Sequence, residues 1–414
     1  MIRYRRASLL GLFFLFGLMP RACPAQNRDV ICNNGDGVFE EEFRTGVRVR
    51  VAASRNGELA TRLCDAAFHW DKGSLAIAAG ASQLDVDAFG VDLGLGTPVV
   101  AFQVKKSAAD CCMEYKIYSL RSPPALLRSI SGGEFFSAAD TDLDGRVEIW
   151  TDDAAAVSGF ENYLLSELDF APPVVLRFVR GRLLDASSEF QPYFDRKIAQ
   201  ERAKLSPQDV EEFKSSDAKL AASADVSASR LYHLRTIKMK ILEIVWCYLY
   251  SGREEQAWHS LAELWPAADV ERIRAALLHA RSRGIHSQVD GISAEVRTGR
   301  EVQTKIFDAT TVPTTMPGVT PKGVDLKLEI TTPKAILMLR PPPANAVELG
   351  LAQLESELQL VIDSAGKVRS VEMVGAQAAD EALINSTSTW KFIPAFNAGR
   401  PVASRILLGV SLKR

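Results

Sequence analysis

Short runs in which hydrophobic and polar residues alternate dominate the chain from about Val38 to Leu184. Gly, Asp, Ser and Pro separate these runs and favour turns between them. Alternation with a period of two is typical of strands that bury one face, and it is clearest in VRVRVAA, SLAIAAG, TPVVAFQV, YKIYSL, VEIWT and PPVVLRFV. The pattern predicts a β-rich domain over residues 26–184, built as an open two-unit meander or sandwich.

The hydrophobic spacing then becomes helical, which predicts a helical region over residues 185–290. Ser206 followed by Pro207 is a favourable helix start, because the serine can cap the first turn and proline fits the first helical position. Gly252 ends one helix and Pro266 ends the next. Several helices in succession are therefore expected here, separated by short turns.

One helix pair in this region has a distinctive spacing. Tyr248, Gly252, Ala257 and Leu261 are spaced as in a tetratricopeptide hairpin, in which the small alanine lets two helices approach. Since stacked repeats need about three copies to bury a continuous face, a generic antiparallel helix pair is the alternative. The tryptophans of this region are interpreted as core residues rather than a binding pocket; they are Trp246, Trp258 and Trp265.

A Pro- and Thr-rich stretch containing DATTVPTTMPGVTPKG predicts an extended linker over residues 291–334. In the segment 335–414, alternation resumes on both sides of DSAGK, which predicts a hairpin. ADEALINSTSTW has helix-like offsets, and the last run, ASRILLGVSLKR, alternates again with Ile406, Leu408, Val410 and Leu412 on one face. The C-terminal module is therefore expected to be ββαβ.

The N-terminus has the features of an export signal. Arg3, Arg5 and Arg6 precede an apolar run from residue 7 to residue 19, and small residues follow at Cys23 and Ala25. We expect a signal peptide over residues 1–25; lipidation at Cys23 is the alternative. The run is shorter than the roughly 20 residues that a membrane-spanning helix needs, so no permanent membrane span is expected.

Composition supports several folded domains. The chain has 414 residues, of which 47% are hydrophobic and 24% charged, enough for a multidomain α+β protein with more than one core. Its net charge of -2 provides no basic surface for nucleic acid. After cleavage an odd number of cysteines would remain, so one or two disulfides are possible with a thiol left over. Cys247 lies in an apolar run and is expected to be buried; Cys32, Cys64, Cys111 and Cys112 are the bridge candidates.

The sharpest local motif places carboxylates at alternate positions. Asp140, Asp142 and Asp144 precede Gly145, which permits a tight reversal, and Glu148 can close the shell. Such an oxygen cage suits Ca²⁺, so these four acidic residues are the candidate metal ligands and Ca²⁺ the candidate structural ion. Because a strand follows, the loop resembles the calcium loops of FG-GAP-type β repeats. An ion-free turn of aspartates is the alternative.

A second aspartate pair, Asp85 and Asp87, precedes another strand at a similar position. Phe89 stands where a third carboxylate would be needed, so this counterpart is expected to hold no ion.

Motifs for catalysis are lacking in the sequence. The histidines do not form a zinc-binding HExxH, and no GxSxG sequence occurs. LGLGTPVV leads into a strand, whereas a phosphate-binding loop leads into a helix. We therefore expect a non-enzymatic protein; an exported hydrolase is the alternative, since catalytic triads are assembled in space.

The C-terminal segment is similar to the TonB C-terminal domain family. The hairpin VIDSAGKVRSVEMV is followed by the helix DEALINSTSTW, the turn WKFIPAFNAGRPV and a terminal strand. The family's Trp-x-Phe-x-Pro turn is matched by Trp390, Phe392 and Pro394, and its Gly-basic-Pro turn by Gly399, Arg400 and Pro401. Trp390 and Phe392 are expected to anchor the helix on the sheet.

The resemblance implies a periplasmic binding or scaffold protein of a Gram-negative bacterium. Its module would capture an extended peptide or receptor segment beside an exposed strand. The partner would be an outer-membrane receptor or another envelope protein, as in transmembrane transport. An energy transducer with a retained N-terminal anchor is the alternative, because coupling to an inner-membrane motor needs a permanent anchor.

Overall fold

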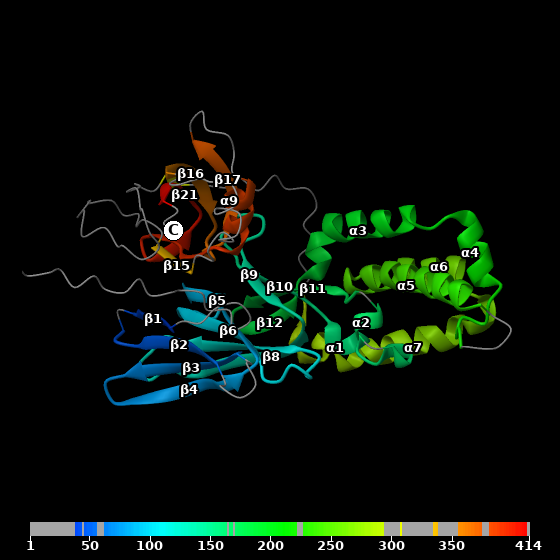
Figure 1. Ribbon diagram of the computed structural model, residues 1–414, viewed down its shortest axis with the longest axis horizontal. Coiled ribbons are helices and arrows are strands. Elements are labelled where there is room, and N and C mark those ends of the chain that lie inside the picture. Colours follow the sequence, from blue (N-terminus) through cyan, green and yellow to red (C-terminus); the bar gives the residue numbers. More distant parts are fainter. Residues whose placement is uncertain are drawn as a thin grey trace, which may run out of the picture.

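The computed structural model describes residues 38–43, 45–55, 62–163, 165–168, 170–221, 227–293, 307–308, 334–337, 355–374 and 381–411. The expected signal peptide over 1–25, most of the expected linker over 291–334, and Leu412 lie outside this part. The fold is mixed α+β, with several β-sheets and several helices (Figure 1). In the described part of the chain, no helix has the length and apolar character needed to cross a membrane.

Three antiparallel meanders form the N-terminal β region. The first contains β1 (Val38–Glu42), β2 (Arg48–Arg55), β3 (Arg62–Trp70) and β4 (Gly73–Ala81). The second contains β5 (Gln83–Val91), β6 (Val99–Lys105), β7 (Met113–Ser119) and β8 (Leu126–Gly133). The third contains β9 (Phe136–Ala139), β10 (Glu148–Asp152), β11 (Pro173–Val179) and β12 (Arg182–Asp185).

The second meander lies between the other two, and strand β6 shows why. Val100 and Phe102 of β6 join a core shared with the first meander, whereas Val99 and Ala101 join a core shared with the third. A strand buried on both faces reads as a continuous apolar run.

The alternation pattern predicts two units, but the structure has three, because strands such as β9 are short and buried and lack a clear alternation.

The helical region follows β12 and returns to the same sheet. It contains the main helices α3 (Gln191–Ala203), α4 (Pro207–Lys214), α5 (Ala228–Tyr250), α6 (Glu254–Leu264) and α7 (Val270–Arg283). Its shorter helices are η2 (Ser187–Phe190), η3 (Ala267–Asp269) and η4 (Ile285–Gln288), whereas α1 (Ala154–Val157), η1 (Phe160–Asn162) and α2 (Leu165–Leu168) lie earlier, between β10 and β11. Strand β13 (Gly291–Ile292) then pairs in parallel with β12. The helices extend to one side of the sheets in Figure 1.

Local signals explain where these helices begin and end. Ser206 caps α4 in a reciprocal capping box with Asp209, as the Ser-Pro start predicts. Gly252 adopts φ +76° after α5, so α5 and α6 form a tight helix pair in which Ala257 is fully buried. The predicted core role of the tryptophans holds for Trp246 and Trp265, which are both fully buried.

The cysteines are divided between disulfides and a buried thiol. Cys111 and Cys112 are joined to each other. Cys64 is also disulfide-bonded, and its partner lies outside the described residues. Burial raises the pKa of the Cys247 thiol to about 12, so this residue behaves as a small core hydrophobe.

The C-terminal module (residues 355–411) is built on a hairpin. Its sheet has the order β14-β21-β16-β17, in which the last strand pairs with the first strand of the hairpin. The strands are β14 (Phe307–Asp308), β16 (Glu355–Ile362), β17 (Val368–Val374) and β21 (Ser404–Ser411), and the helices between them are α9 (Glu381–Ser386) and η5 (Thr387–Thr389). The predicted ββαβ order is therefore present among the described elements.

Additional short strands connect the helix to the last strand. Strand β18 (Lys391–Ile393) pairs with β15 (Lys334–Leu337), and β19 (Ala395–Asn397) pairs with β20 (Arg400–Val402). One core holds the module together, and its buried members are Leu358, Leu360, Ile362, Trp390, Phe392, Ile406 and Leu408. This core contains both aromatic residues of the Trp-x-Phe-x-Pro turn, because the turn folds back over the hairpin.

Candidate metal centre and its contact with the C-terminal module

The acidic loop, defined as Asp140–Glu148, joins β9 to β10 and is shaped by its backbone. Ala139 at the end of β9 pairs with Glu148 at the start of β10, so Asp140 and Glu148 flank the mouth of the loop. Leu143 has φ 59° and Gly145 has φ +86°. These left-handed residues reverse the chain between the strands, a conformation that glycine adopts without steric cost.

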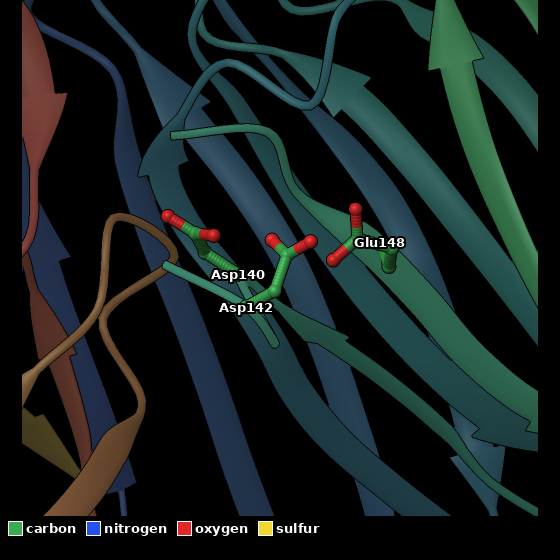
Figure 2. A group of neighbouring side chains, drawn as sticks. All are labelled: Asp140, Asp142 and Glu148. Carbon is green, nitrogen blue, oxygen red and sulfur yellow. The ribbon is translucent and has the colours of Figure 1, made fainter. Parts of the chain in front are cut away.

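Carboxylates from three positions meet in this loop. Oxygen atoms of Asp140, Asp142 and Glu148 all lie within 4.8 Å of one another. Asp140 and Glu148 are fully buried, and Asp142 is half-buried. Figure 2 shows the Asp142 carboxylate between the other two. Residues at these distances could hold a metal ion, because carboxylate oxygens are the usual ligands of hard divalent cations.

Some of these buried oxygens already have hydrogen-bond donors and others do not. The Gly145 N–H donates to Asp140 Oδ2 over 2.9 Å, and the Thr141 N–H donates to Glu148 Oε2 over 3.2 Å. In contrast, neither Asp140 Oδ1 nor Glu148 Oε1 accepts a hydrogen bond from any described residue. Buried polar atoms usually have a hydrogen-bond partner, so these two oxygens are free to accept an ion or a water molecule.

A nearby arginine compensates only part of this negative charge. Arg177 Nη1 lies 3.7 Å from Glu148 Oε1. The same guanidinium donates to both carboxylate oxygens of Glu189, over 2.8 and 2.5 Å, and all three side chains are buried. Its charge is therefore shared between two glutamates, and Glu148 receives the longer contact.

The pKa values of the three carboxyl groups show that their ionised forms are disfavoured in the cluster. Burial raises the pKa of Glu148 to about 9, and the neighbouring aspartates add to that shift. Burial also raises the pKa of Asp140 and of Asp142, and the negative charge of Asp144 contributes to both shifts. Desolvation and like charges disfavour the ionised forms. A bound cation would reverse this effect, because it stabilises the carboxylates in their charged state.

Asp144, the remaining predicted ligand, is not brought into this group. Its Oδ1 accepts from the Arg146 N–H over 2.8 Å and its Oδ2 from Arg146 Nε over 2.9 Å. Aspartate side chains often bond the backbone two residues ahead in turns. The structure thus unites three of the four predicted ligands, and Asp144 stabilises the turn beside them.

The hairpin turn of the C-terminal module contacts the acidic loop directly. This turn, Asp363–Lys367, joins β16 to β17. The Asp140 N–H donates to Asp363 Oδ2 over 3.0 Å, and the Ser364 hydroxyl donates to Asp140 Oδ2 over 2.7 Å. In Figure 2 this turn passes beside Asp140. The sequence contains no signal for the contact, since aspartate and serine are ordinary hairpin-turn residues.

Lysines of the module bind the second aspartate pair. Asp85 and Asp87 lie inside strand β5 rather than in a loop. Lys391 Nζ donates to Asp85 and, over 2.6 Å, to the Val86 carbonyl, and Lys367 Nζ donates to Asp87. Asp87 also accepts from the Tyr115 hydroxyl over 2.6 Å. The expected loop counterpart is thus part of an interface between the β region and the C-terminal module.

The residues of the Trp-x-Phe-x-Pro and Gly-basic-Pro turns and of the last strand lie as follows. Trp390 and Phe392 are each 2% exposed, and Pro394 between β18 and β19 is buried. Gly399, with φ +78°, forms the β19–β20 turn, and Pro401 pairs with Phe396. In β21, Ile406 and Leu408 are buried, and Val410 pairs with Ser356.

Strand β17 forms one edge of the module's sheet. It pairs with β16 on one side, and no strand of the described residues pairs with its other side. The opposite edge strand is β14, which pairs with β21 at Ser404 and Arg405. Figure 1 shows β17 pointing away from the β region. An unpaired edge presents backbone N–H and C=O groups to an incoming strand.

Two histidines lie near carboxylates, and in both cases the contact is structural. His233 Nε2 lies 3.1 Å from Asp209 Oδ1, but Asp209 and Ser206 are already occupied in the cap of α4. His286 Nδ1 lies 3.6 Å from Asp185 Oδ2. The other oxygen of this carboxylate, Asp185 Oδ1, accepts a hydrogen bond from the Ser187 N–H.

Comparison with known proteins identifies no relative: no family model, no curated protein and no solved structure matches the chain.

Proposed function

We propose that this protein is an exported, non-enzymatic binding or scaffold protein of the Gram-negative periplasm. Its C-terminal module captures an extended peptide, or a segment of an outer-membrane receptor or envelope protein, by strand addition at β17. The observation that carries the proposal is the edge position of β17 in a sheet whose opposite edge is the two-residue strand β14. An added strand needs such an edge, because its affinity comes from main-chain hydrogen bonds.

Side chains along β17 support this role. Glu372 is exposed and Val371 is half-buried, and Val374 at the outer end is 44% exposed. Alternating exposed and half-buried positions let an incoming strand pair its backbone while its side chains contact both faces. The buried Trp390 and Phe392 hold the sheet rigid beneath this edge.

Photocrosslinking tests the proposal in cells of the source organism. A photoreactive residue at Glu372 is expected to crosslink to an envelope protein. The matched control is the same residue at Ser74, which is exposed on β4, an edge strand of the first meander. Equal crosslinking at both positions, or none at Glu372, would contradict strand capture at β17.

The acidic loop supports a second proposed property, the binding of a structural Ca²⁺ ion. The observation behind it is that Asp140 Oδ1 and Glu148 Oε1 are buried and accept no hydrogen bond from the described residues. The larger Ca²⁺ tolerates an irregular set of carboxylate, carbonyl and water oxygens, whereas Mg²⁺ demands a near-ideal octahedron.

Calorimetry with purified full-length protein tests the ion and its ligands together. Ca²⁺ is expected to bind more tightly than Mg²⁺, and Asp142→Ala is expected to abolish binding. Asp144→Ala is the comparison, because Asp144 lies outside the cluster but its charge acts on the cluster; this variant is expected to weaken binding without abolishing it. Loss of binding in Asp144→Ala but not in Asp142→Ala would contradict the assignment of the ligands.

A further inference from the structure

Asp140 belongs to two sites at once. Its side chain is part of the carboxylate cluster, and its Oδ2 accepts the Ser364 hydroxyl from the C-terminal module. Its backbone N–H donates to Asp363. A ligand that fixes the position of Asp140 would therefore stabilise the acidic loop and the Asp363–Lys367 turn together.

The Asp363–Lys367 turn is preformed for this contact. Asp363 Oδ1 accepts from the N–H groups of Ala365 and Lys367, each over 2.9 Å, which leaves Oδ2 for Asp140. Gly366 adopts φ +83°, and its carbonyl accepts the Phe392 N–H over 2.8 Å. The turn is thus held rigidly by the module's own core and meets the loop as a fixed surface.

The interface is buried as well as polar. Asp363 and Ser364 are fully buried, and Ala365 is 2% exposed within the core shared by the second and third meanders and the helices. Arg369 Nη2 donates to the Thr141 carbonyl over 3.1 Å. The turn therefore inserts into the β region at the acidic loop, and the first residues of β17 are held there with it.

Other contacts hold the module independently of the loop. Lys391 binds Asp85 and the Val86 carbonyl, both on β5, and Ile393 packs against the core of the first two meanders. The module consequently keeps part of its attachment when the loop is perturbed. An ion at the loop would alter the strength of docking rather than create it.

We propose that cation binding at the acidic loop and docking of the C-terminal module stabilise each other. This inference rests on the proposed Ca²⁺ site. An ion among Asp140, Asp142 and Glu148 would remove their mutual repulsion and fix Asp140 in the orientation that accepts Ser364. Because linkage is reciprocal, docking would in turn raise the affinity of the loop for the ion. The ion thereby controls how firmly the module that carries β17 is held.

Hydrogen–deuterium exchange and calorimetry on the full chain test this coupling. In the parent protein, Ca²⁺ is expected to slow amide exchange in the acidic loop and also in the Asp363–Lys367 turn. Ser364→Ala and Lys391→Met are both expected to weaken Ca²⁺ binding by about fivefold or more. The Lys391 variant is decisive, because its described partners are Asp85 and Val86 rather than the carboxylate cluster.

Ser388→Ala is the matched control, since this hydroxyl donates to the Asn385 carbonyl within its own helical segment. It is expected to bind Ca²⁺ as the parent does, and thermal melts establish that all variants fold. If Ca²⁺ protects the loop but not the turn, or if Lys391→Met binds Ca²⁺ with unchanged affinity, the coupling is wrong while the Ca²⁺ site stands. If the parent chain binds no Ca²⁺, the proposed site fails and the coupling fails with it.

Discussion

The Ser364 hydroxyl donates a 2.7 Å hydrogen bond to Asp140 Oδ2, joining residues that are 224 positions apart in the sequence. Both side chains are fully buried. The contact links the tip of the C-terminal hairpin to the loop that carries the candidate metal ligands. The C-terminal module therefore covers one side of the candidate metal site.

Gly366→Ala is expected to destabilise the C-terminal module. An added Cβ would lie 1.8 Å from the Phe392 carbonyl oxygen, at a residue with φ +83°. Left-handed strain alone costs about 1–3 kcal/mol, and the clash adds to it. Hydrogen exchange of the β16 amides in the full chain measures the loss. Gly399→Ala is the control, because it has a similar φ of +78° but no atom within 4 Å; equal losses would show that the close approach is unimportant.

Trp390→Ala is expected to reduce the stability of the module by about 3–5 kcal/mol, as for other buried large aromatics. The side chain is 2% exposed and packs in the core of the module. Hydrogen exchange of β16 amides in the full chain is the measurement, and exchange in α5 should not change. Trp258→Ala is the comparison variant, because this half-buried tryptophan lies on α6, outside the C-terminal module. It should leave the exchange of the β16 amides unchanged. Unchanged exchange in β16 would mean that Trp390 does not anchor the module.

Arg177→Met is expected to destabilise the protein by about 3–5 kcal/mol, because it leaves buried glutamates without a cation. Arg177 is 2% exposed and binds Glu189 through both Nη atoms. Arg48→Met is the surface control; its ion pair with Glu40 is solvent-exposed, and such pairs contribute at most about 1 kcal/mol. Chemical denaturation of both variants at one pH gives the comparison, and similar losses would contradict the buried role of Arg177.

Asp152 is expected to make stability depend on pH. Burial raises the pKa of its carboxyl from 3.8 to about 6. Between these values the unfolded chain releases a proton that the folded chain keeps. The stability from this group is therefore present below pH 3.8 and is lost as the pH rises toward 6.

Asp152→Asn removes this titration while keeping an oxygen for the Glu134 N–H, which donates to Asp152 Oδ1 over 2.7 Å. Relative to the variant, the parent is expected to lose up to about 3 kcal/mol across this pH range, at ~1.4 kcal/mol per pKa unit. Urea denaturation from below pH 4 to above pH 6 measures the difference. A constant difference between the two proteins would contradict the raised pKa.

Much of the local structure was predictable from periodicity. The alternating runs predict β2, β4, β6, β7, β10 and β11, and the helical spacing predicts α3 to α7. Ser206 and Gly252 mark helix ends in the sequence because capping and left-handed turns depend on residue type. The hairpin around DSAGK was predictable from the alternation on both sides of its turn residues. The burial of Trp390 was expected from the resemblance of its turn to a known family.

The candidate site was only partly predictable. Alternate aspartates followed by glycine indicated the acidic loop, and three of its four candidates come together. Asp144 does not, because a side chain near its own backbone donors can bond them first. Asp85 and Asp87 also stand at alternate positions in the sequence but lie in strand β5, where Gln103 of β6 and Tyr115 of β7 donate to them.

The sequence by itself therefore determined the helices and strands, the hairpin turn and the loop rich in carboxylates, since these depend on neighbours a few residues apart. Only the tertiary structure decided that Ser364 meets Asp140 and that Lys391 meets Asp85. These contacts join segments more than 200 positions apart, and each depends on how whole sheets pack. Such packing is set by the complementary shape and burial of many side chains together, so no single stretch of sequence records it.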